Sequence, residues 1–90
     1  MSTTVTDSVG DERLTTTEYR ERLSELPPSA KLVAKVLEGE SPLSQGQLAE
    51  ESLLPDRTVR YALNRLEESD IVGSRYSFKD ARKQVYFLRT

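Results

Sequence analysis

The sequence predicts a mainly α-helical domain that ends in a small β-hairpin, which is an α+β fold. Apolar residues recur at helical spacing in several segments before residue 70, and β-branched and aromatic residues gather in two short segments after it. The chain has 90 residues, which allows one domain with a core only a few side chains deep. We therefore expect four helices followed by two strands.

The first helix is expected over residues 16–26, after a tail at residues 1–15. The tail is rich in Ser, Thr and Asp and poor in large apolar side chains, which predicts disorder. Thr15 and Glu18 have the spacing of a capping box, and Pro27-Pro28 ends the helix because proline disfavours helical geometry in the residue before it. The apolar stripe of this helix consists of Tyr19, Leu23 and Leu26.

The second helix is expected over residues 29–38 and closes at Gly39. One face repeats at i, i+3, i+4 and i+7, and it consists of Ala30, Val33, Ala34 and Leu37. Leu32 and Val36 form a second apolar face. A helix with two apolar faces packs on two sides, so we expect this one at the centre of the core.

Two further helices follow, joined by a tight turn at residues 53–55. Ser44 and Gln47 form another capping box, which starts a helix over 44–52. Pro55 suits the first position of the next helix, expected over 55–69. The buried face of this fourth helix consists of Val59, Ala62, Leu63 and Leu66. Its other side is polar and carries arginine.

The remaining segment, residues 71–88, predicts a β-hairpin. Residues 71–76 and 84–88 are rich in β-branched and aromatic residues, and no Asn-Gly or Asp-Gly pair marks a two-residue turn between them. The connecting loop is therefore longer than the minimum. Residues 41–43 could add a brief strand to this hairpin. We expect its aromatic side chains to pack on the sheet rather than to stack on bases: Tyr76, Phe78, Tyr86 and Phe87.

Composition excludes several classes of function. The chain has no Cys and no His, so disulfides, thiolate metal sites, His-based nucleophilic triads and most zinc chemistry are ruled out. We expect neither an enzyme nor a bound cofactor or metal. No apolar run has the length of a membrane span, and the first ten residues lack the pattern of a signal peptide. These features favour a cytoplasmic protein that contacts no membrane.

Charge is divided unevenly along the chain, whose net charge is −2. Residues 1–54 hold ten acids and five bases, whereas residues 55–90 hold five acids and eight bases. The cationic part contains the fourth helix and the hairpin. Because phosphate attraction depends on the local field more than on the total charge, this division favours contact with nucleic acid there. An ordinary fluctuation of charge is the alternative.

Residues 29–88 resemble a winged helix-turn-helix domain of MarR-like and TrmB-like prokaryotic transcriptional regulators. The resemblance is carried by LSQGQLAEESLLPDRTVRYALNRLEESDIV and by the basic, aromatic hairpin after it. It implies that the partner is double-stranded DNA, with the fourth helix as the recognition helix in the major groove. The hairpin would be the wing. The domain would then span residues 16–90.

The resemblance assigns base reading to the start and the outward side of the recognition helix, namely Arg57, Thr58, Arg60, Tyr61 and Asn64. Arginine can donate two hydrogen bonds to guanine, and asparagine can pair with adenine. Arg65 is a further candidate on this helix. The wing would contact phosphates, with one arginine entering the minor groove, through Arg75, Lys79, Arg82 and Lys83.

Each of these residues also has a plainer interpretation. Arg57 and Arg60 could be solvated charges, Tyr61 could cover the edge of the core, and Arg65 could pair with Glu68. The wing cations could belong to a solvated loop that guards an edge strand. Asp56 departs from a phosphate-facing helix start because its carboxylate repels phosphates.

The leading hypothesis is a sequence-specific DNA-binding transcriptional regulator, and the alternative is a winged-helix module that binds another protein. Regulators of this type are usually dimers, because a palindromic site needs two recognition helices roughly 34–36 Å apart. The helix over 16–26 could close the core of one chain or pair with a second copy. No effector-binding residue can be named. Nine Arg against four Lys, with an excess of acids, resembles proteins of salt-loving archaea.

Overall fold

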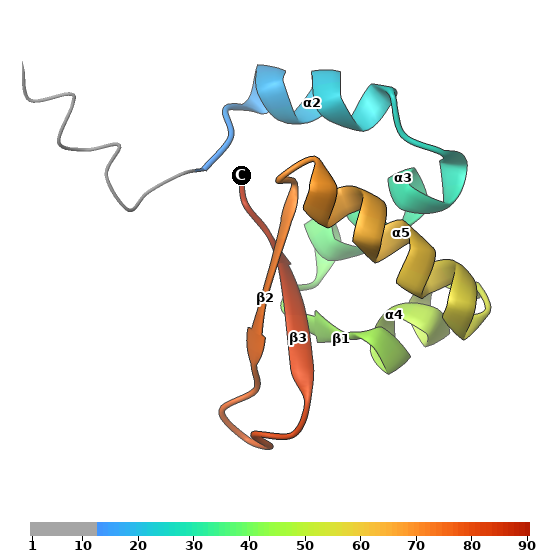
Figure 1. Cartoon of the computed structure of the whole chain (residues 1–90), viewed down its shortest axis with the longest axis vertical. Coiled ribbons are helices and arrows are strands. Elements are labelled where there is room, and N and C mark those ends of the chain that lie inside the picture. The colour runs from blue at the N-terminus through green and yellow to red at the C-terminus, as the bar shows by residue number, and fades with distance from the viewer. Residues whose placement is uncertain (1–12) are drawn as a thin grey trace, which may run out of the picture.

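The computed structural model describes residues 13–90, so most of the expected tail lies outside the described residues. It has four helices and a three-stranded antiparallel sheet within that range (Figure 1). The expectation of an α+β fold with a terminal hairpin is confirmed. The helices are α2 (Thr16–Ser24), α3 (Pro28–Gly39), α4 (Gln45–Ser52) and α5 (Asp56–Glu68), and the strands are β1 (Leu43–Ser44), β2 (Val72–Tyr76) and β3 (Gln84–Leu88).

The helix bounds differ from the expected ones by one or two residues because several end positions are caps. Ser44, Pro55 and Ser69 lie just outside α4 and α5 as cap residues. The helix expected over 16–26 ends at Ser24, and the backbone N–H of Glu25 folds back onto carbonyls of the last turn. None of the helices within residues 13–90 is both long and apolar enough to cross a membrane.

Helix α3 lies at the centre of the core and packs chiefly against α5. Its main apolar face is buried as expected, with Val33 and Ala34 fully enclosed. The second face is only partly covered, because Leu32 is 40% exposed and Val36 is half-buried. The largest side chains that are fully buried come from α3, α4, α5 and the start of the hairpin: Leu37, Leu48, Leu63, Leu66, Ile71, Val33 and Val59.

Helix α2 lies across the end of the body formed by α3 and the C-terminal end of α5 (Figure 1). Both hydrogen bonds of the Thr15–Glu18 capping box form, at 3.1 and 2.9 Å. The phenol of Tyr19 donates a hydrogen bond to the Glu38 carboxylate of α3. Arg22 donates to the carbonyl of Ser69 at 2.9 Å, which attaches α2 to the end of α5.

The helix-turn-helix consists of α4, a short turn and α5. The capping box of Ser44 and Gln47 starts α4, and the side chain of Gln45 donates to the carbonyl of Asp56 at 3.4 Å. Leu53 ends α4 in the left-handed conformation, with φ 62° and ψ 25°. These local contacts set the direction in which α5 leaves the turn.

The sheet has the strand order β1-β3-β2, and both pairings are antiparallel. The brief strand that residues 41–43 could supply is present as β1, shifted to Leu43–Ser44. Leu43 pairs with Tyr86, and Tyr86 pairs with Ser74 on the other side. Because side chains alternate between the faces of a strand, this row lies on one face of the sheet. Leu43 is buried there, so this face is the one that meets the helices.

Candidate nucleic-acid interface

The outward side of α5 carries one stripe of polar and aromatic side chains. At about 100° per residue, Arg57, Tyr61 and Asn64 lie opposite the buried face of the helix. All three are exposed, and Tyr61 retains 48% of its accessible surface. The stripe runs along the helix that follows the turn, which is the position from which a recognition helix contacts base edges.

Arg60 lies on the flank of α5 that faces the sheet, where it is close to Tyr86 of β3. Burial raises the pKa of the Tyr86 phenol, the nearby Glu67 carboxylate raises it further, and the Arg60 guanidinium lowers it. Arg60 is exposed, so its charge is available on the side of α5 that leads to the hairpin.

Thr58 and Arg65 lie on the opposite flank and are both half-buried. The guanidinium of Arg65 donates to the Tyr61 hydroxyl at 2.9 Å and forms an ion pair with Glu68 at 3.8 Å. The expected alternative for Arg65, a pair with Glu68, is therefore observed, and pairs of this kind contribute only about 0–1 kcal/mol. Because Tyr61 accepts this hydrogen bond, its own proton points elsewhere and can be donated to an outside acceptor.

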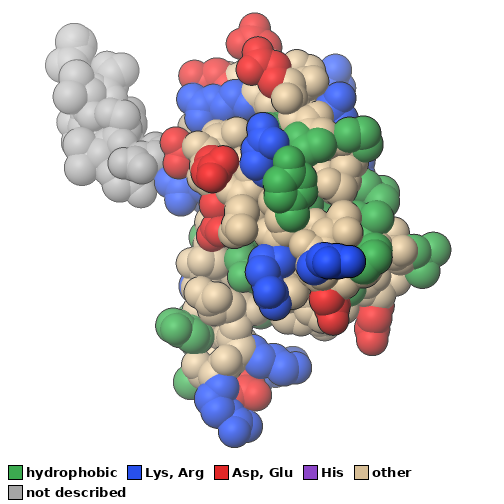
Figure 2. Space-filling model, turned by 45° about the vertical axis from the view of Figure 1, so that its right-hand side comes forward, with side chains coloured by type: hydrophobic (Ala, Val, Ile, Leu, Met, Phe, Trp, Pro, Cys, Tyr) green, Lys and Arg blue, Asp and Glu red, His purple; other side chains and the backbone are tan. Residues whose placement is uncertain are grey.

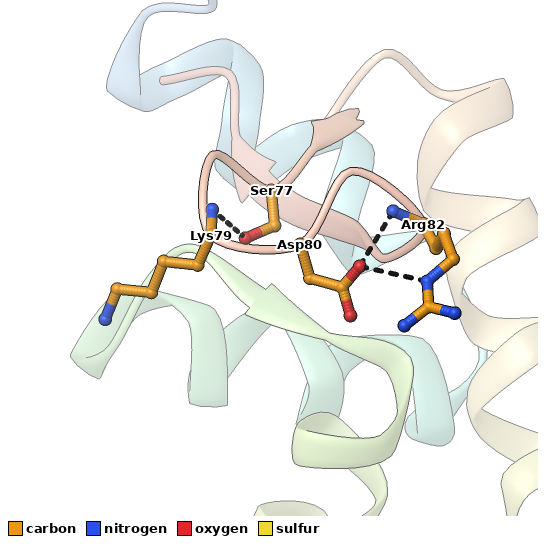
Figure 3. Close-up of polar contacts among 4 residues, drawn as sticks. All are labelled: Ser77, Lys79, Asp80 and Arg82. Carbon is orange, nitrogen blue, oxygen red and sulfur yellow. Dashed lines mark hydrogen bonds and ion pairs between the residues drawn. The ribbon is translucent and has the colours of Figure 1, made fainter.

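The hairpin loop, residues 77–83, is braced by its own hydrogen bonds (Figure 3). The Ser77 hydroxyl accepts from the Lys79 N–H at 3.1 Å, and one Asp80 carboxylate oxygen accepts from both the N–H and the Nε of Arg82, at 3.0 and 3.4 Å. Two backbone bonds, from Ser77 to Lys83 and from Lys83 to Asp80, close the loop. The side chains of Lys79 and Arg82 extend to opposite sides of it (Figure 3).

Arg75 projects from the other face of the hairpin. It pairs in register with Val85, so it shares a face with Val85 and not with Tyr86. Its guanidinium lies 4.9 Å from the centre of the Phe78 ring, a distance typical of a cation–π contact. Arg75 therefore lies on the face of the hairpin that points away from α5.

Lys and Arg side chains are visible both at the hairpin tip and on the helical body in the face shown by Figure 2. Acidic side chains interrupt them, so no continuous basic surface forms on that face. The structure thus brings Arg57, Tyr61 and Asn64 together on α5 and Lys79, Arg82 and Lys83 together on the loop. It places Arg75 on the far side of the hairpin from α5.

Two aromatic residues do not pack on the sheet, which corrects the expectation stated for all four. Phe78 is 93% exposed and Tyr76 is 62% exposed. Tyr86 and Phe87 are half-buried, and Tyr86 packs against the core. Position explains the exposure of Phe78, which lies in the loop and has no strand partner, whereas Tyr76 is the last residue of β2 and pairs with Gln84 next to the loop.

No group of three or more acidic residues converges on a common point within residues 13–90 in a way that could hold a metal ion. The expectation that the protein holds no metal applies to the whole chain, so it stays a prediction.

Residues 35–72 match a family model described as winged helix-turn-helix DNA-binding. Three solved proteins share the fold at 22% sequence identity. The PcaV transcriptional regulator from Streptomyces coelicolor has a TM-score of 0.66, with 72% of this chain and 48% of that chain covered. The zinc-responsive MarR family member ZitR from Lactococcus lactis has a TM-score of 0.64, with 71% and 44% covered. YusO from Bacillus subtilis has a TM-score of 0.66, with 79% and 50% covered.

These matches confirm the winged helix-turn-helix fold and the resemblance to MarR-type domains at the level of fold. The chain spans about half the length of the solved proteins that it matches. No curated protein sequence matches it.

Proposed function

We propose that this protein is a sequence-specific transcriptional regulator that binds double-stranded DNA through its winged helix-turn-helix. Helix α5 enters the major groove, and the hairpin loop contacts phosphates or the adjacent minor groove. The observation that supports this role best is the outward stripe of α5, where Arg57, Tyr61 and Asn64 are exposed together, opposite a fully buried face. The role needs no catalysis, metal or cofactor, and it suits a protein of the cytoplasm.

The contacts divide into two kinds with different consequences. Arg57, Arg60 and Asn64 carry the donors and acceptors that distinguish base pairs, and each bidentate pair contributes about 1–3 kcal/mol of discrimination. Lys79, Arg82 and Lys83 carry charge on a loop, which suits phosphates and conveys no sequence information. Thr58 and Arg65, being half-buried, suit backbone contacts at the edge of the stripe.

A selection from random-sequence duplexes, followed by fluorescence anisotropy with the selected duplex, tests the proposal. The Arg57→Ala variant should weaken binding to the selected duplex about 5- to 150-fold, the factor that corresponds to about 1–3 kcal/mol, and should broaden the selected sequence. Lys31→Ala removes the same charge from an exposed position on α3 and is the matched control. Binding should fall as salt rises, and Lys79→Ala should reduce the salt slope by about one. Absence of any selected sequence for the wild-type chain would refute the proposal.

The alternative function is a winged-helix module that binds another protein. The exposed aromatic rings of Tyr76 and Phe78 favour it, because aromatic residues are enriched in protein interfaces. Under this alternative, removal of the α5 stripe would leave partner binding intact, whereas removal of the two rings would abolish it.

A homodimer on a palindromic site is part of the proposed function. Two copies would place their α5 helices one helical turn of DNA apart. Sedimentation of the chain with and without the selected duplex would give the number of copies, and a single copy on a site without symmetry would contradict the dimer. The arginine-rich, acidic composition further suggests a salt-loving archaeal source. Because high salt weakens phosphate contacts steeply, binding there would rely more on base-edge and shape contacts.

A further inference from the structure

Phe78 is the most exposed of the large hydrophobic residues in the described chain, at 93%. Its ring has no place in the core, and its one aromatic contact is with the guanidinium of Arg75, 4.9 Å from the ring centre. Exposing a large apolar ring to water is unfavourable, and a cation–π contact at an exposed site contributes only about 0.5–1 kcal/mol to the folded state. The position is therefore best explained by what the ring contacts when the protein is bound.

The loop around Phe78 is strongly cationic and has a fixed shape. Residues 75–83 hold four basic side chains and one acid, Asp80. The hydrogen bonds of Ser77 and Asp80 hold the loop backbone in place. Because the braced loop loses little conformational freedom on binding, its side chains are presented in a defined arrangement.

The cations of the loop lie on more than one side of it. Lys79 and Arg82 extend to opposite sides of the loop (Figure 3). An open hollow of about 490 Å³ adjoins Phe78 between the hairpin and the start of α4, and Arg75, Lys79 and Lys83 line it together with the acid Asp80. A narrow loop that carries an exposed apolar ring, with Lys79 and Arg82 extending to its opposite sides, matches a groove with two negatively charged walls.

We propose that Phe78 inserts into the DNA minor groove next to the major-groove segment that α5 contacts, with Lys79 and Arg82 on phosphates of opposite strands. This inference rests on the proposed function and adds a residue that shapes the bound DNA. The minor groove is about 6 Å wide, so one ring on a two-stranded ribbon can enter while flanking cations reach both backbones. Apolar side chains act in this way as wedges, which partly unstack a base step and kink the duplex.

Arg75 has a positioning role in this arrangement. Its guanidinium lies over the Phe78 ring and lines the hollow. It therefore holds the ring in place and contributes positive charge next to the backbone of one DNA strand. Removing Arg75 should therefore weaken binding in two ways. The salt slope should fall because a cation is lost, and the unstacking signal should fall because the ring is no longer held.

The test uses the full chain and the duplex that the wild type selects from a random pool, with 2-aminopurine placed at successive positions in its flank. The wild type should raise the fluorescence of 2-aminopurine at one flanking step. Phe78→Ala should abolish that rise and weaken binding about tenfold, with an unchanged salt slope because no charge is lost. Phe78→Leu should keep most of both effects, since leucine also serves as a wedge. Leu32→Ala, which trims a partly exposed apolar side chain on α3, is the control and should leave both readouts unchanged.

Three results would separate the possible failures. If Phe78→Ala binds within twofold of the wild type while Arg57→Ala binds weakly, the regulator stands and the wedge is refuted, which would assign the ring to a protein partner. If Phe78→Ala weakens binding but the wild type gives no 2-aminopurine signal, the ring contacts the backbone and insertion is refuted. If the wild type selects no duplex, both the wedge and the proposed function fail.

Discussion

Replacing Leu53 with glycine should stabilise the protein, although it removes a large apolar side chain. Leu53 ends α4 with φ 62° and ψ 25°, a left-handed conformation that costs a residue with a Cβ about 1–2 kcal/mol. Its side chain is 89% exposed, so little packing is lost with it. Its backbone N–H bond to the Ala49 carbonyl, at 2.9 Å, is available to glycine as well.

Glycine also has more conformational freedom than leucine in the unfolded chain, which lowers the free energy of unfolding by roughly 0.5–1 kcal/mol. The difference favours Leu53→Gly by about 0.5–1 kcal/mol. For a domain of this size, that gain corresponds to a rise in melting temperature of roughly 2–8 °C. Urea denaturation followed by far-UV circular dichroism measures the change directly, and an unchanged m-value would show that both variants unfold in the same way.

Glu50→Gly is the matched control for this prediction. Glu50 is exposed in the interior of α4, where the backbone is helical, so glycine there should destabilise by about 1 kcal/mol. The two glycine variants should thus shift stability in opposite directions. If Leu53→Gly is as unstable as Glu50→Gly, the left-handed conformation stores no strain and the reasoning is wrong.

Two further changes test the packing of α2 and of the hairpin. Tyr19→Phe removes the hydroxyl whose hydrogen bond is the largest cause that lowers the pKa of the Glu38 carboxyl below its ordinary value of 4.5. A lowered carboxyl pKa stabilises the folded state above pH 4.5, and this stabilisation fades on acidification, so the difference in free energy of unfolding between wild type and variant should be largest above that pH and shrink below it. A difference that stays constant between pH 3 and 7 would contradict this. Gly73→Ala would place a Cβ 2.8 Å from the end of the Phe87 ring, so the ring must move, whereas Gly39→Ala has no atom within 4 Å of its new Cβ. Gly73→Ala should therefore have a lower melting temperature than Gly39→Ala in thermal unfolding, and equal melting temperatures would contradict the clash.

The helices could be predicted from the sequence because their signals are local. The capping boxes that begin at Thr15 and Ser44 each involve residues three apart, and both form as expected. The apolar spacing of α5 likewise fixes which side is buried, and therefore which side carries Arg57 and Asn64. These features need no knowledge of distant contacts.

The hairpin could be predicted only in outline, since the direction of its side chains depends on register. Shifting a strand by one residue moves every side chain to the opposite face. No turn signal in the sequence sets the register, so the placement of Arg75 away from α5 could not be foreseen, whereas the position of Phe78 in the loop did indicate its exposure. Leu53 is a comparable case, because leucine carries no preference for the left-handed conformation that α4 needs at its end.

Under the proposed function, the distribution of charge along α5 determines how the helix would approach DNA. Its N-terminal half carries Arg57 and Arg60, whereas its C-terminal half ends in Glu67 and Glu68. Phosphates attract the first pair and repel the second, and the helix dipole adds positive potential at the N-terminal end. Asp56 opposes this trend at the first position. Arg65 pairs with Glu68, so the acidic end is partly neutralised within the protein. An approach with the N-terminal half deepest in the groove is therefore the one that the charges favour, and it leaves the C-terminal end of α5 to its contacts with α2.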